Sequence, residues 1–251
     1  MFWKHKIIFM DYAGGTPMSK NVRNEMDKLQ SIFANPSGLY TEATKAKEYL
    51  ASFRARIAKV LNVSKNEIVF TSGGTESNNL AMLGVFEQFK TPGFVPHIIT
   101  SVIEHSSTLE VCLEIERRGG EVTRLPVNEE GLISINDLKT AIKENTVLVS
   151  FSFANSEIGT VQPISEIGKI IADKKNSSKN IPYFHIDTGS VPLYYSMDLA
   201  RHGIDLLTLD AAKMYGPKGV GALYVNSGTQ RKPIIFGGGQ DRGLRCGTEN
   251  L

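Results

Sequence analysis

Hydrophobic and polar positions follow two different periods along this chain, and the switches between them mark helices and strands. Residues 41–61 carry apolar or small side chains at helical spacing, which predicts a long amphipathic helix. Further helices are predicted after the Gly73-Gly74-Thr75 turn through 79–83, over 106–118 and over 164–174. Short apolar runs bounded by turn residues predict strands at 68–72, 97–101, 121–125, 146–151, 183–186, 205–209 and 221–225.

The alternation of strands with helices predicts how the chain is organised. Strands separated by helices form βαβ units, so we predict an α/β fold with a mostly parallel sheet. In sheets of this kind the ligand site lies beyond the carboxyl ends of the strands, where the loops begin. Residues that follow the predicted strands are therefore the candidates for a binding or catalytic site.

Five of the predicted strands are followed closely by a polar side chain. The pairs are Thr75 after 68–72, His105 after 97–101, Asn155 after 146–151, Asp187 after 183–186 and Lys213 after 205–209. Each one alone is also explained as a turn residue. Because the carboxyl ends of parallel strands share one edge of the sheet, a common site explains all five better.

Composition and charge narrow the function classes. The 251 residues, 41% hydrophobic and 22% charged, are typical of a soluble globular protein, and a net charge of +2 does not indicate nucleic-acid binding. Two cysteines, Cys112 and Cys246, cannot form a disulfide framework, which favours a reducing compartment. No apolar run approaches the ~20 residues of a membrane helix, and the N-terminus lacks a signal-peptide pattern. We therefore expect a cytoplasmic protein without nucleic-acid or membrane partners.

Lys213 and Asp187 have the residue types and positions that cofactor chemistry needs. Lys213 lies between an apolar strand and a Gly-Pro turn, where desolvation favours a neutral amine that can form a Schiff base. Asp187 follows an apolar strand, and a buried carboxylate is costly unless a cation such as a protonated pyridine ring pairs with it. A surface lysine and a turn-capping aspartate are the alternatives that these segments leave open.

The segment 72–77 and His105 add an anion site and an aromatic contact. Gly73 and Gly74 let the backbone approach an anion, and the helix that begins near Thr75 offers free amides and a favourable dipole. A plain helix cap is the alternative. His105 has a flat ring that can stack on a cofactor or carry protons, and a structural role is the alternative. Lysine, carboxylate, imidazole and anion-binding turn together match pyridoxal 5′-phosphate (PLP) better than any other cofactor.

The chain resembles, nearly end to end, the cysteine desulfurases of the class V aminotransferase family, which are fold-type I PLP enzymes. The matching segments are Phe9–Pro17, Asn35–Tyr40, Thr71–Asn79, Glu104-His105, Ala154–Thr160, His185–Asp187, Lys213–Gly219, Gly237–Gln240 and Arg245–Asn250. This resemblance implies a three-layer α/β/α large domain with a mixed, mainly parallel sheet over 19–251. It also implies that residues 1–18 pack with a C-terminal small domain that this chain lacks.

The same resemblance assigns roles to the candidate residues. Lys213 would hold PLP as a Schiff base and transfer protons, Asp187 would keep the ring nitrogen protonated, and His105 would stack on the ring as the second catalytic residue. The other implied cofactor-binding positions are Gly73, Gly74 and Thr75 for the phosphate, Asn155 and Ser156 for the ring hydroxyl, Ser190, Asp210, and Thr248, which reaches the phosphate of the partner subunit in family homodimers. No metal ligands are assigned.

The chain departs from the family pattern next to the lysine. The family usually has Ser-x-His before it, and this chain has Asp210, Ala211 and Ala212. A carboxylate at Asp210 brings like charges together at the phosphate unless it turns away or pairs. Ser190 stands where glutamine is usual, and Ser156 where the loop has its second asparagine. These differences predict weakened cofactor binding and turnover.

By the resemblance, the persulfide-forming cysteine and the arginine that binds the substrate carboxylate lie in the C-terminal part that is lacking. Cys112, on an amphipathic helix, is interpreted as a packed core thiol. Cys246 lies in a Gly-rich loop where family members often have serine and is interpreted as unreactive, with a reactive thiol beside Arg245 as the alternative.

The implied function is sulfur transfer from L-cysteine, giving alanine and a persulfide, in sulfur metabolism and iron–sulfur cluster assembly. The enzyme would be a homodimer that works with a sulfur-acceptor protein, and this chain would be its cofactor-binding part, from a truncated or split protein. One alternative is another class V aminotransferase or lyase activity. The other is a non-catalytic PLP-fold partner in sulfur transfer, against which the retention of Lys213 and Asp187 argues.

Overall fold

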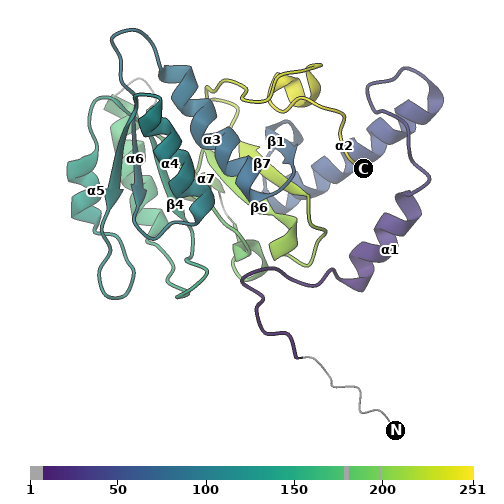
Figure 1. The fold of residues 1–251 in the computed structure, drawn as a ribbon, viewed down its shortest axis with the longest axis horizontal. Coiled ribbons are helices and arrows are strands. Elements are labelled where there is room, and N and C mark those ends of the chain that lie inside the picture. Colours follow the sequence, from purple (N-terminus) through teal and green to yellow (C-terminus); the bar gives the residue numbers. More distant parts are fainter. Residues whose placement is uncertain (1–7, 178–180, 198) are drawn as a thin grey trace.

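A single twisted sheet forms the centre of the molecule (Figure 1). The computed structural model describes residues 8–177, 181–197 and 199–251. Within them, seven strands are arranged in the order β1-β7-β6-β5-β4-β2-β3. The strands are β1 (Ile68–Thr71), β2 (His97–Ser101), β3 (Glu121–Leu125), β4 (Thr146–Ser152), β5 (Tyr183–Asp187), β6 (Leu206–Asp210) and β7 (Gly221–Val225).

The strand directions confirm the predicted mixed, mainly parallel sheet. β7 runs antiparallel to both of its neighbours, β1 and β6, and the other strand pairs are parallel. The carboxyl ends of β2, β4, β5 and β6 therefore meet at one edge. The register pairs Ser152 with Asp187, which brings the polar ends of two central strands together.

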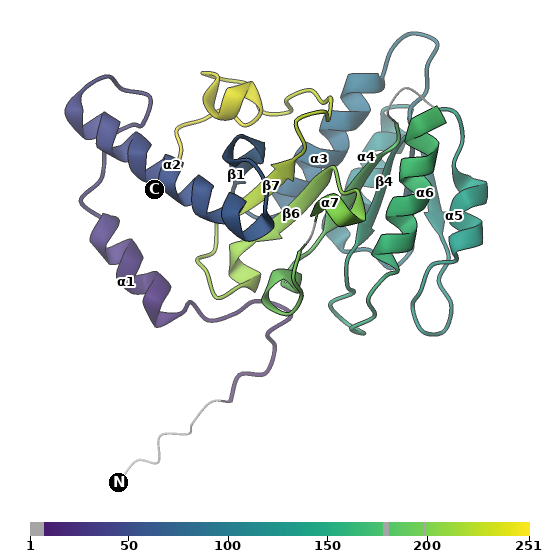
Figure 2. The ribbon, with the colours of Figure 1, turned by 180° about the vertical axis from the view of Figure 1, so that it is seen from behind.

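The helices cover both faces of the sheet and confirm the three-layer arrangement (Figures 1 and 2). The described helices are α1 (Lys20–Leu29), α2 (Thr41–Leu61), α3 (Gly74–Phe89), α4 (Ser106–Arg117), α5 (Ile135–Ala141), α6 (Ile164–Ser177) and α7 (Leu199–His202). Side chains of α3 and α4, such as Met82 and Ile115, pack on one face around Ile98. Side chains of α5 and α6, such as Leu138, share the other core with Ile99. Alternate residues of β2 thus face opposite layers.

The predicted elements agree with the structure except for three helices. The bounds of α2 are those predicted. The helix ends at Leu61 because Asn62 takes a left-handed conformation and its amide caps the carbonyls of Ala58 and Lys59. α1 was not predicted, because its apolar stripe is limited to Val22, Met26 and Leu29 in an otherwise polar segment, and none of its residues is buried. α5 and α7 were also missed, since seven and four residues are too few to show a helical period.

The described part of the N-terminal segment runs along the loop that follows β6. The amide of Thr16 donates to the carbonyl oxygen of Ala212 at 2.8 Å, and the amide of Ser19 to that of Tyr215 at 2.9 Å. Residues 8–19 thus contact the large domain directly, and the packing of 1–18 against a small domain stays a prediction. Among the described residues, no helix is long and apolar enough to cross a membrane.

Candidate active site

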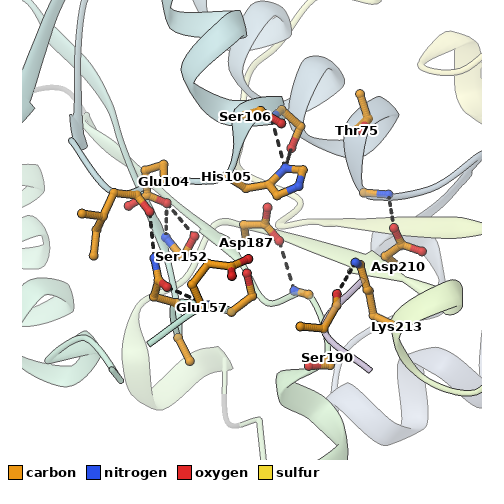
Figure 3. A pocket seen from close by; sticks show the side chains of 18 residues that line it. Thr75, Glu104, His105, Ser106, Ser152, Glu157, Asp187, Ser190, Asp210 and Lys213 are labelled. Atoms are coloured by element: carbon orange, nitrogen blue, oxygen red, sulfur yellow. Dashed lines mark hydrogen bonds between the residues drawn. The ribbon is translucent and has the colours of Figure 1, made fainter. Parts of the chain in front are cut away.

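A pocket lies where the carboxyl ends of the central strands meet the first turns of α3 and α4 (Figure 3). Its volume of about 350 Å³ is within the range of small-molecule sites. Most residues predicted for the site line it, namely Gly74, Thr75, His105, Asn155, Ser156, Asp187, Ser190, Asp210 and Lys213. Gly73 lies directly before this lining as the N-cap of α3, and Thr248 is not among the lining residues.

Lys213 enters the pocket from a short 3-10 turn that follows β6. The turn is tight, because the amide of Gly216 donates to the carbonyl of Ala211 at 2.8 Å and a Cβ at Gly216 would clash with Ala211. The Lys213 Nζ donates to the carbonyl oxygen of Ala13 at 2.5 Å. The amine therefore lies at the pocket wall, held by the N-terminal segment.

Asp187 ends β5 and forms part of the pocket floor. Its Oδ1 accepts from the amide of Gly189 at 3.1 Å, and its Oδ2 accepts from Nδ2 of Asn78 at 2.7 Å. Burial raises the pKa of the Asp187 carboxyl above its ordinary value, and these two hydrogen bonds act in the opposite direction. No salt bridge to Asp187 is found among the described residues, and a protonated ring nitrogen would be a suitable partner for this buried carboxyl.

A chain of hydrogen bonds connects Asp187 to His105. The second Nδ2 hydrogen of Asn78 has an acceptor in the hydroxyl of Ser107, 2.8 Å away. The Nδ1 atom of His105 lies 2.8 Å from that hydroxyl and accepts from the amide of Ser107 at 3.1 Å. Because an amide can only donate, Nδ1 is the acceptor, and the neutral ring carries its proton on Nε2.

Sequence reasoning did not find Asn78 or Ser107. Both are fully or almost fully buried, and both are ordinary helix residues in the printed sequence. Asn78 leaves its Oδ1 buried without a partner among the described residues, so its orientation is fixed by the two donors alone. Its place one turn after the Gly-Gly-Thr segment was the available signal.

Glu104 is a second buried carboxyl beside the pocket that sequence reasoning missed. Its Oε1 accepts from the hydroxyl of Ser101 at 2.5 Å, and its Oε2 accepts from the amide and hydroxyl of Ser152 at 2.7 and 2.6 Å. Burial raises the pKa of Glu104 to about 7, and the nearby charge of Asp187 acts in the same direction. Glu104, which precedes His105 in the sequence, thus ties the end of β2 to the end of β4.

Asn155 holds the loop after β4 in place. Its Nδ2 donates to the carbonyl of Ile103 at 2.9 Å, and its Oδ1 accepts from the amide of Glu157 at 2.9 Å. Both ends of the side-chain amide are therefore bonded to backbone groups. Ser156, the next residue, is exposed and lines the pocket.

The start of α3 forms the other end of the pocket. Gly221 of β7 packs so closely that a Cβ there would lie 2.6 Å from the Cα of Gly73, so this position needs glycine. The amide of Gly74 donates to Oδ2 of Asp210 at 3.2 Å, and the amide of Ala212 donates to Oδ1 at 2.9 Å. The carboxylate of Asp210 thus turns onto the helix start that the sequence predicted to bind phosphate.

The Gly-rich closing segment is anchored outside the pocket. Asp241 pairs with Arg54 at 2.5 Å and accepts from the amide of Phe70 at 3.0 Å. Thr248 is exposed, and its hydroxyl lies 3.5 Å from Nδ2 of Asn35, so two segments that carry the resemblance meet here. A role of Thr248 toward a partner subunit stays a prediction.

Comparison with protein families identifies the class. The Aminotransferase class-V family model matches residues 8–248, and the chain belongs to this family. Class V aminotransferases and cysteine desulfurases are PLP-dependent transferase-type enzymes in general.

Individual relatives narrow the class further. The chain is 45% identical to the cysteine desulfurase IscS of Clostridium botulinum, over 98% of this chain and 60% of that protein. It is 42% identical to the IscS of Dictyoglomus turgidum, over 97% of this chain and again 60% of that protein. The chain therefore spans about 60% of the length of the curated relatives that it matches.

Solved structures are similar in fold. The structure of SspA in complex with cysteine has a TM-score of 0.89 and 40% identity, covering 96% of this chain and 68% of that one. A NifS-like protein also has a TM-score of 0.89, with 34% identity over 97% of this chain and 65% of that one. The fold prediction and the family resemblance are both confirmed.

The pocket fits PLP well at one end and less well at the other. At the ring end, an amine at Lys213 and a carboxyl at Asp187 that lacks a cation are the partners that an aldehyde and a pyridine nitrogen need. At the phosphate end, Asp210 already bonds an amide of the helix start.

Proposed function

We propose that this chain is the PLP-binding large domain of a cysteine desulfurase-like enzyme that removes sulfur from L-cysteine. The observation that carries the proposal is that Asp187, at the end of β5, and Lys213, in the turn after the neighbouring strand β6, line the same cavity. The position of His105 supports the proposal, because this residue lines the same cavity from the start of α4 (Figure 3). The similarity to SspA, solved in complex with cysteine, supports L-cysteine as the substrate.

The bound cofactor would supply an electron sink for bond cleavage in the amino-acid substrate. Lys213 would bind the aldehyde and move a proton at Nζ, after Nζ leaves the carbonyl of Ala13. Asp187 would hold a proton on the ring nitrogen, and Asn78 would keep its carboxylate oriented. His105 would present its Nε2–H, since Nδ1 is bonded to Ser107.

Sulfur would leave the substrate for a thiol that neither cysteine of this chain supplies. Cys112 is fully buried in α4, and burial raises the pKa of its thiol to about 12, so it does not form a thiolate at neutral pH. Cys246 is buried against Gly237 and does not line the pocket. We therefore expect no sulfide release from L-cysteine by this chain alone, and catalytic sulfide production by it would contradict this assignment.

A homodimer, a sulfur-acceptor protein and a cytoplasmic location complete the proposal. The family resemblance supports the dimer, and the exposed Thr248 would reach the partner's phosphate site. Two free cysteines are consistent with a reducing compartment. A non-catalytic scaffold role is disfavoured, since a scaffold has no need of a lysine and a buried acid in one pocket.

Titration of the chain with PLP tests the proposal. We expect a saturable visible absorbance band from the lysine-bound cofactor, and we expect Lys213→Ala to lose it. Lys218→Ala is the matched control, because Lys218 is an exposed lysine only five positions away and lies outside the pocket lining. Equal bands from all three proteins would mean that surface lysines bind the aldehyde, and the proposal would be wrong.

A further inference from the structure

Asp210 occupies the start of α3 because the sheet register puts it there. Asp210 pairs with Gly221 across β6 and β7, and Gly221 pairs with Thr71 across β7 and β1. α3 begins three residues after Thr71, so its first turn lies two strands away from Asp210. The residue between them on β7 is Gly221, which has no side chain to fill the gap. The carboxylate spans that short gap and bonds the amide of Gly74.

The second oxygen of Asp210 holds the side chain in this orientation. It accepts from the amide of Ala212, two residues further along the same turn. Two backbone donors from two different elements thus fix both oxygens. A carboxylate held by amides at a helix N-terminus is stabilised, because that end carries a partial positive charge.

The charges around Asp210 do not offset it. Among the described residues that line the pocket, four carry carboxyl groups (Glu104, Glu157, Asp187 and Asp210) and one is a lysine. That lysine, Lys213, donates to the carbonyl of Ala13 instead of to Asp210. The charge of Asp210 also reaches Asp187, where it acts to raise the pKa of that carboxyl. A further anion at the start of α3 would therefore meet the charge of Asp210 with no lysine bonded to it.

We propose that Asp210 is a specificity residue that competes with the phosphate of the cofactor for the first turn of α3. This inference rests on the proposed PLP-binding function. It further states which part of PLP contributes to the binding affinity. The pocket holds its ligand mainly through the aldehyde and the ring, and the phosphate adds little. Like charges at contact distance are unfavourable even where solvent weakens them.

Comparison of PLP with pyridoxal, which lacks the phosphate, tests this inference by equilibrium dialysis of the 251-residue chain. Asp210→Asn keeps an oxygen for one amide and turns an NH₂ donor toward the phosphate. We expect it to raise the affinity for PLP by about tenfold or more and to leave the affinity for pyridoxal unchanged. Inorganic phosphate alone should also bind more tightly to Asp210→Asn than to the parent chain.

Two controls keep the result interpretable. Glu144→Gln removes the same charge from an exposed position at the opposite end of β4, and we expect both affinities to stay the same. Asp210→Ser repeats the test with a smaller hydroxyl, should the asparagine variant fail to fold.

The outcomes separate the two proposals. An unchanged ratio of PLP to pyridoxal affinity in both Asp210 variants would overturn this inference and leave the PLP-binding function standing. Absence of binding of both compounds to every variant would overturn the proposed function and this inference with it.

Discussion

The two ends of the pocket differ in how their polar groups are prepared for a ligand. At the ring end, Asp187, Asn78, Ser107 and His105 are joined by hydrogen bonds, and burial raises the pKa of the Asp187 carboxyl. At the helix end, Asp210 satisfies a backbone donor of α3 with a charge of this chain. The ring end, with its buried Asp187, suits a cationic aromatic ligand. At the helix end, the carboxylate of Asp210 already occupies the place of an anion. The same fold can therefore keep one half of a cofactor site while altering the other.

Asp187→Asn should break the ring end and have the largest effect. It removes the charge that a protonated ring nitrogen needs, so we expect the affinities for PLP and for pyridoxal to fall together, by about a hundredfold. Dialysis against both compounds measures this. The result contrasts with Asp210→Asn, which should act on PLP alone and in the opposite direction. A loss confined to PLP would show that Asp187 acts on the phosphate, contrary to the account.

Glu104→Gln should reveal the second buried acid of the ring end through the pH dependence of stability. Burial raises the pKa of Glu104 in the folded chain to about 7, above the ordinary value of 4.5, so the folded state holds a proton that the unfolded state releases. Stability from this group is fully present below pH 4.5 and is lost as pH rises from there through 7, by about 3 kcal/mol in total.

Chemical denaturation at pH 5 and pH 8 tests this effect. The parent chain should lose more stability over that interval than Glu104→Gln, whose amide still accepts from Ser152 and donates to Ser101. Parallel pH profiles for the two proteins would show that Glu104 does not change its protonation state between pH 5 and pH 8. That result would contradict a pKa near 7.

Asn78→Ala should have the smallest effect, and it sharpens the comparison by loosening the ring end without removing a charge. Loss of the donors to Asp187 and Ser107 should lower the free energy of unfolding by about 1 kcal/mol. It should also shift the ¹⁵N resonances of the His105 ring, because the Ser107 hydroxyl that lies 2.8 Å from Nδ1 loses the donor Asn78. Asn79→Ala is the matched control, because Asn79 bonds only the carbonyl of Thr75 within its own helix. Identical spectra of the two variants would contradict the network.

Much of the fold and part of the site could be predicted from the sequence. The alternation of strand and helix patterns predicted the α/β layers, and the polar residues after the strands do line one pocket. Their convergence follows from parallel strands, which deliver their carboxyl ends to a single edge.

The remaining features depend on contacts between distant residues. Asn78 contacts Asp187 across 109 positions of sequence, and Gly74 contacts Asp210 across 136. The sequence showed a carboxylate at Asp210 and left open whether it turns away or pairs. The answer depends on the register of β1, β7 and β6, and a propensity pattern does not contain that register. α1 escaped prediction because its apolar positions are only Val22, Met26 and Leu29, within ten otherwise polar residues.

Reduction of the PLP-loaded chain with borohydride, followed by peptide mass mapping, tests the central claim most directly. Reduction fixes the cofactor to the amine that holds it, so the modified residue identifies the binding lysine. The account predicts a single saturable adduct on the peptide that contains Lys213. An adduct spread over exposed lysines, or one that leaves Lys213 unmodified, would contradict it.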